Sequence, residues 1–107
     1  DIFKEKSDIL PTADVIIEEV CKFYNLEPPL LRGQGRSKDI SLARQIAMYQ
    51  IRRMTNLSLK EIGAEFGGRD HSTVLNALNR VEDLVKTDPE KAEIIKDITT
   101  NINSRYE

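Results

Sequence analysis

The sequence is poor in the residues that build redox, metal and cofactor sites. Its 107 residues include one cysteine, one histidine and no tryptophan. A single cysteine cannot form an internal disulfide, and with one histidine it cannot supply the four ligands of a structural zinc site. We interpret Cys21 as a small apolar helix residue rather than a nucleophile. Paired carboxylates and Cys–His arrangements are also missing, so we expect a protein that is not an enzyme and binds no cofactor and no metal.

Long apolar runs are missing as well. No segment approaches the roughly 18 apolar residues that span a bilayer, and no charged-apolar-small leader opens the chain. Hydrophobic residues make up 39% and charged residues 32% of the sequence, which is typical of a helical globular domain. We therefore predict a cytoplasmic protein. Membrane contact is not expected, because the apolar stripe of the central helix fits core packing better.

The charge is distributed unevenly along the chain. Residues 32–80 contain nine basic and four acidic residues, a net charge of +5, whereas the rest contains seven basic and fourteen acidic residues, a net charge of −7. A positive middle between acidic ends would orient the domain on a phosphate backbone. Ordinary solvated surface is the alternative interpretation.

The apolar spacing predicts an all-α protein, a compact helical bundle of about six helices without strands or repeats. We divide the chain into a linker remnant at 1–11 and one domain at 12–107. Capping residues and prolines define the helices. We expect helices from Thr12 to about Asn25, from Pro28, from Asp39 or Ser41 to Asn56, from Ser58 to about Phe66, from Asp70 or His71 to Thr87, and from Pro89 onward.

The loop from Arg32 to Asp39 contains Gly33 and Gly35 but is not a nucleotide-binding loop. The pattern GxxxxGK[ST] is absent, and no strand precedes the loop.

The segment "SLKEIGAEFGGRDHSTVLNAL" (58–78) predicts a helix-turn-helix. Ser58 and Glu61 form a capping box, Leu57 and Ile62 flank it as a hydrophobic staple, and Gly67 supplies the positive φ that ends the short helix. A longer helix follows after about four residues. In this motif the second helix enters the major groove with its N-terminal residues against base edges.

The polar residues at the start of the second helix have the chemistry for base contacts. Arg69 and His71 can donate, Asp70 can accept, and Ser72 and Thr73 can do both. Asn76 and Arg80 follow Ser72 at steps of four and extend the same face. Two simpler interpretations stay open: Asp70 is the N-cap of the helix, and His71 is a surface residue without a role.

The sequence "FGGRDHSTVLNAL", preceded by "ARQIAMY" and "TNLSLKEIG", resembles the C-terminal DNA-binding domain of the DnaA family of bacterial replication initiators. The resemblance covers roughly residues 12–84. It implies a helical bundle with a Trp-repressor-like helix-turn-helix that binds boxes similar to TTATnCACA at replication origins. It also implies that the chain lacks the family's ATPase domain and neither binds nor hydrolyses ATP.

The resemblance further implies a set of DNA contacts. Asp70, His71, Ser72 and Thr73 would read the major groove, and Arg36 the adjacent minor groove. We add Arg69 and Asn76 to the major-groove set. Backbone or nearby contacts would come from Lys38, Arg44, Gln45, Lys60 and Arg80.

The sequence departs from the family at two points. Its loop at Gly33-Gln34-Gly35 carries fewer basic residues, and Gln50 occupies a position that is usually apolar, so that it must be exposed or find a partner for its amide.

We predict sequence-specific binding of double-stranded DNA by a monomer at the nucleoid. A stand-alone helix-turn-helix regulator is one alternative. A docking module that binds replication regulatory proteins through the acidic terminal helices is another.

Overall fold

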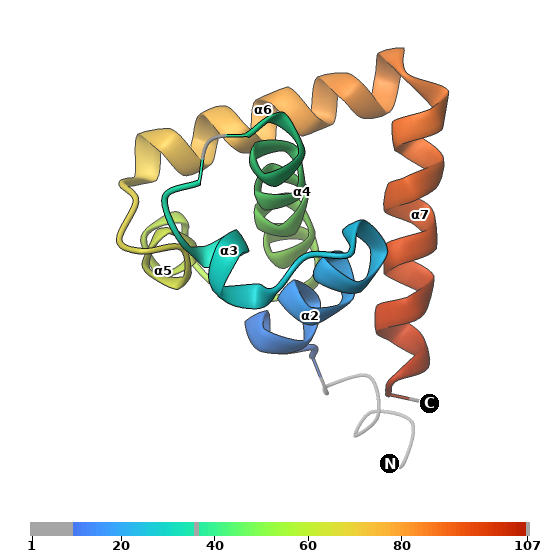
Figure 1. Cartoon of the computed structure of the whole chain (residues 1–107), viewed down its shortest axis with the longest axis horizontal. Coiled ribbons are helices and arrows are strands. Elements are labelled where there is room, and N and C mark those ends of the chain that lie inside the picture. The colour runs from blue at the N-terminus through green and yellow to red at the C-terminus, as the bar shows by residue number, and fades with distance from the viewer. Residues whose placement is uncertain (1–9, 36, 107) are drawn as a thin grey trace.

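The structure, a computed structural model, describes residues 10–35 and 37–106. Over these residues it is all-helical, with no strand, which confirms the predicted fold class (Figure 1). No helix in the described part is long and apolar enough to cross a membrane. The proposed boundary between linker and domain stays a prediction, because residues 1–9 lie outside the described ranges. The helices are α2 (Ala13–Tyr24), α3 (Pro28–Arg32), α4 (Lys38–Met54), α5 (Leu59–Glu65), α6 (His71–Thr87) and α7 (Pro89–Ser104).

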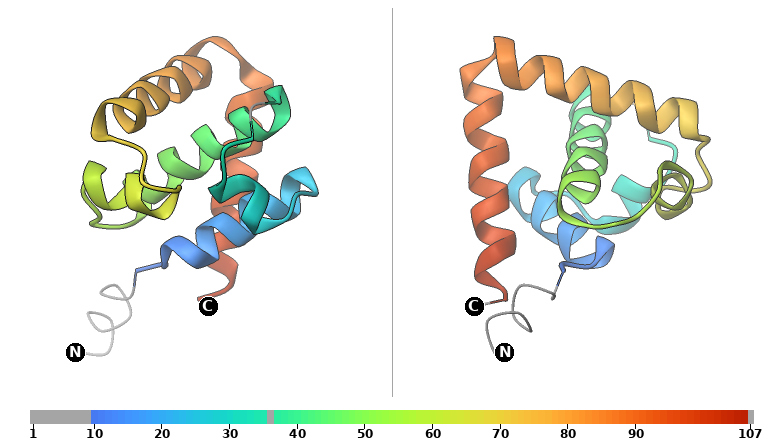
Figure 2. Two further views of the ribbon diagram at one scale, coloured as in Figure 1. Left: turned by 60° about the vertical axis from the view of Figure 1, so that its left-hand side comes forward. Right: turned by 180° about the vertical axis from the view of Figure 1, so that it is seen from behind.

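Helix α4 lies in the middle of the bundle and supplies much of its core. Ile46, Ala47 and Ile51 are fully buried on it, and helices α2, α6 and α7 pack against it. Figure 2 shows from two sides that α6 lies across α4, and that the turn between α5 and α6 sits at the end of the molecule opposite α7. Cys21 belongs to this core, and burial raises the pKa of its thiol. It is therefore a packed apolar residue, as predicted.

Most helix ends fall where the capping residues indicate. The Thr12 side chain accepts from the Val15 N–H at 3.2 Å, and Asn25 ends α2 with a φ of 57°. Helix α4 begins at Lys38, before the predicted start at Asp39 or Ser41. The Ser37 hydroxyl caps it by accepting from the N–H of Ile40. The same helix ends at Met54 with Thr55 as its cap, rather than at Asn56.

Gln50 is fully buried, so its amide must find partners inside the protein. Its Nε2 donates to the carbonyl of Ile95 at 3.0 Å and to Oγ1 of Thr99 at 2.9 Å, both on α7. Its Oε1 accepts from Arg53 at 3.1 Å. Gln50 therefore joins α4 to α7.

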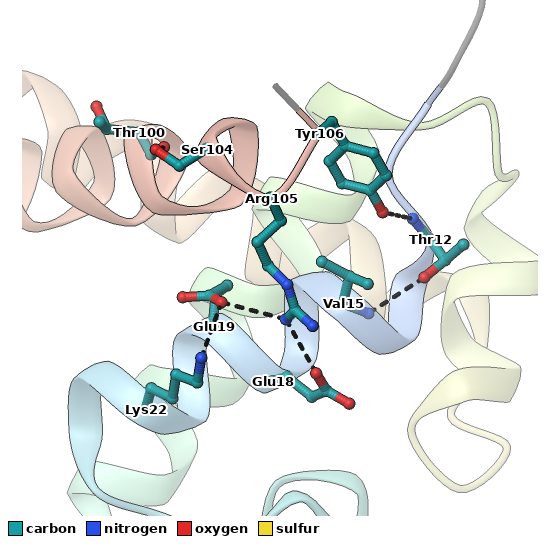
Figure 3. A network of polar contacts seen from close by, with 9 residues as sticks. All are labelled: Thr12, Val15, Glu18, Glu19, Lys22, Thr100, Ser104, Arg105 and Tyr106. Carbon is teal, nitrogen blue, oxygen red and sulfur yellow. Dashed lines mark hydrogen bonds and ion pairs between the residues drawn. The ribbon is translucent and has the colours of Figure 1, made fainter.

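The end of α7 is fixed to α2 by a group of polar contacts (Figure 3). Arg105 lies 2.9 Å from a carboxylate oxygen of Glu18 and 3.1 Å from one of Glu19. The Tyr106 hydroxyl accepts from the backbone N–H of Thr12 at 3.3 Å. Two of the acidic side chains near the N-terminal end of the domain are thus neutralised within the fold.

Candidate nucleic-acid interface

Helices α5 and α6 and the residues between them form the predicted helix-turn-helix. The capping box is present: the N–H of Ser58 donates to the Glu61 carboxylate at 2.8 Å, and the N–H of Glu61 donates to the Ser58 hydroxyl at 3.1 Å. The bond from the Ser58 N–H lowers the pKa of the Glu61 carboxyl group. The box thereby fixes the start of α5.

Gly63, within α5, fixes the turn that follows this helix. Its carbonyl accepts from the backbone N–H groups of Phe66, Gly68 and Arg69 at 3.0–3.1 Å. A Cβ at position 63 would lie 2.0 Å from the carbonyl oxygen of Arg69, so that no side chain fits there. The sequence analysis did not predict this requirement for glycine. Gly63 lies inside a helical pattern, where glycine has no local signature.

The turn itself depends on two adjacent glycines. Gly67 and Gly68 have φ values of 81° and 79°, in the left-handed region that favours glycine. Phe66, the cap residue of α5, is fully buried just before them. The backbone break was predicted at Gly67, and it extends over both residues.

The first turn of α6 projects from the surface. Asp70 caps the helix, with its Oδ1 accepting from the N–H of Thr73 at 2.9 Å, and this bond lowers the pKa of the Asp70 carboxyl group. Asp70, His71, Ser72 and Thr73 are all exposed. The capping interpretation of Asp70 is therefore confirmed, and contact of its carboxylate with a base stays a prediction.

Arg69 is half-buried, unlike the four exposed residues that follow it, and it lies between the two sides of α6. Its Nη2 donates to the carbonyl of Gly33 at 2.9 Å, and its Nε is buried without a hydrogen-bond partner among the described residues. This placement does not support the predicted direct contact of Arg69 with a base. The side chain instead connects the helix-turn-helix turn to the loop after α3.

Arg44 is likewise turned into the protein, with 6% of its surface exposed. Its guanidinium donates to the carbonyls of Leu31 at 2.8 Å, Gly35 at 3.0 Å and Leu30 at 3.4 Å. The desolvation that accompanies burial, together with the nearby charge of Arg69, lowers its pKa. This placement does not support the predicted direct DNA contact by Arg44, because the side chain is almost fully buried and three of its five N–H donors are bonded to carbonyls.

The other predicted residues gather on the two sides of α6. A groove of about 450 Å³ between α4 and α6 is lined by Gln45, Thr73, Asn76 and Arg80, together with Arg44 and Arg69. A second groove of about 450 Å³ brings Lys60 of α5 beside Asp70 and His71. Lys38 is exposed on the first turn of α4 and is not among the residues that line the two grooves. Arg36 lies outside the described residues.

Three basic side chains on or beside α6 lack carboxylate partners among the described residues, as do Arg52 on α4 and Lys96 on α7, whereas some other basic side chains are paired. Arg32 pairs with Asp14 and Glu65, and Arg105 pairs with two glutamates of α2. Within the described ranges, no ion pair joins Lys60, Arg69 or Arg80 to an acidic group. This surface therefore keeps an excess of positive charge. It offers no metal site, since no three His, Cys, Asp or Glu side chains cluster in the described part.

Comparisons with known proteins agree with this geometry. Residues 13–81 match the model of a family described as "Bacterial dnaA protein helix-turn-helix". The chromosomal replication initiator protein DnaA of Methylacidiphilum infernorum (isolate V4) is 42% identical over 93 residues. That match covers 87% of this chain but only 20% of the relative. The similarity thus lies in the helix-turn-helix portion and not in an ATPase domain.

Proposed function

We propose a function for this chain from one premise: it belongs to the bacterial DnaA helix-turn-helix family. The chain binds double-stranded DNA in a sequence-specific manner at short sites, and acts in this way in the initiation of chromosomal replication. The observation that carries the proposal is the exposed first turn of α6, which presents donors and acceptors between two grooves with unpaired basic side chains.

The major groove is read by the exposed residues of α6. His71, Ser72 and Thr73 lie at the N-terminal end of the helix, where residues of a recognition helix meet base edges. Asn76 is exposed one turn further along and has the bidentate amide that suits adenine. Asp70 holds the helix start in place by its cap and remains a candidate acceptor for a cytosine amino group.

Backbone contacts come from the exposed or half-exposed polar groups around this helix, namely Lys38, Gln45, Lys60 and Arg80. The proposal keeps Arg36 as a minor-groove contact on the family resemblance alone. Arg44 and Arg69 contribute to this interface indirectly. Arg69 holds the loop at Gly33 against the helix-turn-helix, and Arg44 holds the same loop at Gly35 against α4.

Selection of binding sites from random duplexes tests this function. We expect enrichment of one short asymmetric sequence similar to TTATnCACA, bound by a single copy of the chain. Fluorescence anisotropy then compares the enriched duplex with a scrambled one at equal salt concentration. Failure to enrich any sequence would contradict the proposal, and so would equal affinity for the enriched and the scrambled duplex. Binding with two copies per site would contradict only the monomeric arrangement.

A further inference from the structure

Helices α6 and α7 meet at a corner, and α4 packs against both of them (Figure 1). A groove of about 260 Å³ lies where the three helices meet. It is lined by Tyr49 and Arg53 of α4, by Val85 of α6, and by five residues of α7 between Ala92 and Thr100. We call it the α7 groove. It shares no lining residue with the two grooves on the sides of α6 described above.

The α7 groove contains two cations and no carboxylate in its lining. Arg53 comes from α4 and Lys96 from α7, so the two charges belong to different walls. The Arg53 guanidinium lies 5.4 Å from the centroid of the Tyr49 ring, and its Nη1 donates to Oε1 of Gln50 at 3.1 Å. Within residues 10–35 and 37–106, no acidic side chain forms an ion pair with either cation. Their charge is therefore not neutralised by this part of the chain.

The other polar groups of the groove leave the cations as its main donors. The Thr99 hydroxyl donates to the carbonyl of Ile95 at 2.9 Å, and the Thr100 hydroxyl donates to the carbonyl of Lys96 at 3.1 Å. Both hydroxyl protons are thus used within α7. A ligand that pairs with the remaining donors must supply anionic acceptors.

The size and the apolar lining of the groove restrict the kind of anion. Val85 and Ala92 are partly exposed in it, so the ligand must also cover apolar surface. Its volume of about 260 Å³ is below the roughly 300–1,000 Å³ of small-molecule sites. A space of this size suits an apolar side chain of a polypeptide whose neighbouring groups reach Arg53 and Lys96.

The surroundings disfavour a nucleic acid at this place. Val85 follows His71 by fourteen residues (85 − 71), which is about 21 Å along α6 at 1.5 Å per residue. Glu93 and Asp97 are exposed on α7 within four residues of Lys96. A continuous phosphate backbone would pass these carboxylates and be repelled, whereas a short acidic segment needs only the two cations.

We propose that the α7 groove is a docking site for an acidic segment of a partner protein, in which carboxylates on both sides of one apolar side chain pair with Arg53 and Lys96. Charge complementarity of this kind selects the partner and guides its approach. The docking alternative predicted from the sequence used the acidic surface of the terminal helices. The groove is instead a basic recess within that acidic region, and it stays accessible when the first turn of α6 is occupied.

Peptide titration tests this site in the absence of DNA. The probes are short synthetic peptides with one leucine between two glutamates, placed two, three or four residues from it, together with versions that have glutamine for glutamate. At least one acidic peptide should give saturable ¹H–¹⁵N shifts of the amides of Lys96, Thr99 and Thr100. Its glutamine version should bind at least tenfold more weakly. Absence of saturation with the whole set, or equal affinity of the two versions, would overturn the inference.

Lys96→Gln, with Lys86→Gln as its matched control, locates the contact. Both lysines are exposed, and both changes remove one positive charge, but only Lys96 lines the groove. Lys96→Gln should weaken the acidic peptide about tenfold, and Lys86→Gln should leave its affinity unchanged. Arg53→Gln should act like Lys96→Gln, although it also removes the bond to Gln50. Equal affinities of the Lys96 and Lys86 variants would contradict a site at this groove.

Competition with a scrambled duplex separates this inference from the proposed function. The duplex should neither displace the bound peptide nor shift the amides of Thr99 and Thr100. Displacement that Lys96→Gln abolishes would assign the groove to nucleic acid and overturn the inference. A chain that binds the acidic peptide but selects no DNA sequence would contradict the proposed function alone.

Discussion

The Nη2 of Arg69 donates a hydrogen bond to the carbonyl oxygen of Gly33 at 2.9 Å. This bond joins the turn of the helix-turn-helix to the loop that follows α3. Arg32 adds a second connection, since its Nη1 donates to the carbonyl of Glu65 at 2.9 Å. Helix α6 and this loop are thus connected through the turn, and a change in the turn should affect the positions of both.

Replacement of Gly63 should show how closely the turn is packed. Alanine is favoured over glycine by about 1 kcal/mol inside a helix, so an uncrowded Gly63→Ala would stabilise the protein. Because its Cβ would lie 2.0 Å from the Arg69 carbonyl oxygen, we expect instead a loss of about 3 kcal/mol in the free energy of unfolding, measured in urea. Gly68→Ala is the control, since nothing lies within 4 Å of its Cβ and only the left-handed φ opposes it. A smaller loss at position 63 than at 68 would contradict this packing.

The cap on α6 should make stability depend on pH. Its hydrogen bond to Thr73 lowers the pKa of Asp70 below the usual 3.8, so the ionised cap stabilises the fold above that value. This contribution is lost as the pH falls through the lowered pKa of the folded state. Asp70→Asn keeps a neutral acceptor, so the difference in unfolding free energy between wild type and this variant should shrink between pH 6 and pH 2.5. A difference that stays constant or grows on acidification would exclude the charged cap.

Gln50 offers a test of the junction between α4 and α7. Gln50→Ala should lower the free energy of unfolding by about 2–4 kcal/mol, because it opens a cavity and removes the bonds to Ile95 and Thr99. Gln50→Leu should cost less, since it fills most of the space and the Ile95 carbonyl still accepts from the Thr99 hydroxyl at 2.9 Å. Chemical denaturation of both variants provides the comparison. If leucine costs as much as alanine, then the amide bonds rather than the volume stabilise this junction.

Lys60 is expected to contact the DNA backbone without reading sequence. Wild-type binding should give a slope of log K against log salt of about −4 to −7, corresponding to roughly five to eight phosphates. Lys60→Ala should make this slope shallower by about 1 and weaken selected and scrambled duplexes equally. Lys96→Ala, exposed on α7, is the control and should change neither. A loss confined to the selected duplex would show that Lys60 reads a base.

Much of the fold was accessible from the sequence because local signals and tertiary structure agree. The capping box at Ser58, the left-handed Asn25 and the cap at Asp70 are short-range features, and each has its predicted geometry. The start of α4 was misplaced because Ser37, Asp39 and Ser41 are all suitable N-caps. Only the packing of the helix decides among them.

The candidate site was less accessible, because charge does not indicate where a side chain points. Arg44 and Arg69 look like ligand-binding residues in the sequence, yet both donate to backbone carbonyls of α3 or of the loop that follows it. Gly63 gave no signal for a similar reason: what excludes a side chain there is the carbonyl of Arg69, six residues further along the chain. The exposure of His71 and Thr73, in contrast, agrees with their predicted place on the first turn of the second helix.

The ratio of affinities for the selected and scrambled duplexes, measured by anisotropy at one salt concentration, tests the central claim most directly. If the first turn of α6 reads bases, His71→Ala and Thr73→Ala should each reduce binding to the selected duplex by about 1–3 kcal/mol and leave the scrambled duplex nearly unchanged. Thr100→Ala, an exposed threonine on α7, should leave both affinities as they are. Equal losses on the two duplexes, or a ratio that neither variant changes, would show that this turn does not read sequence.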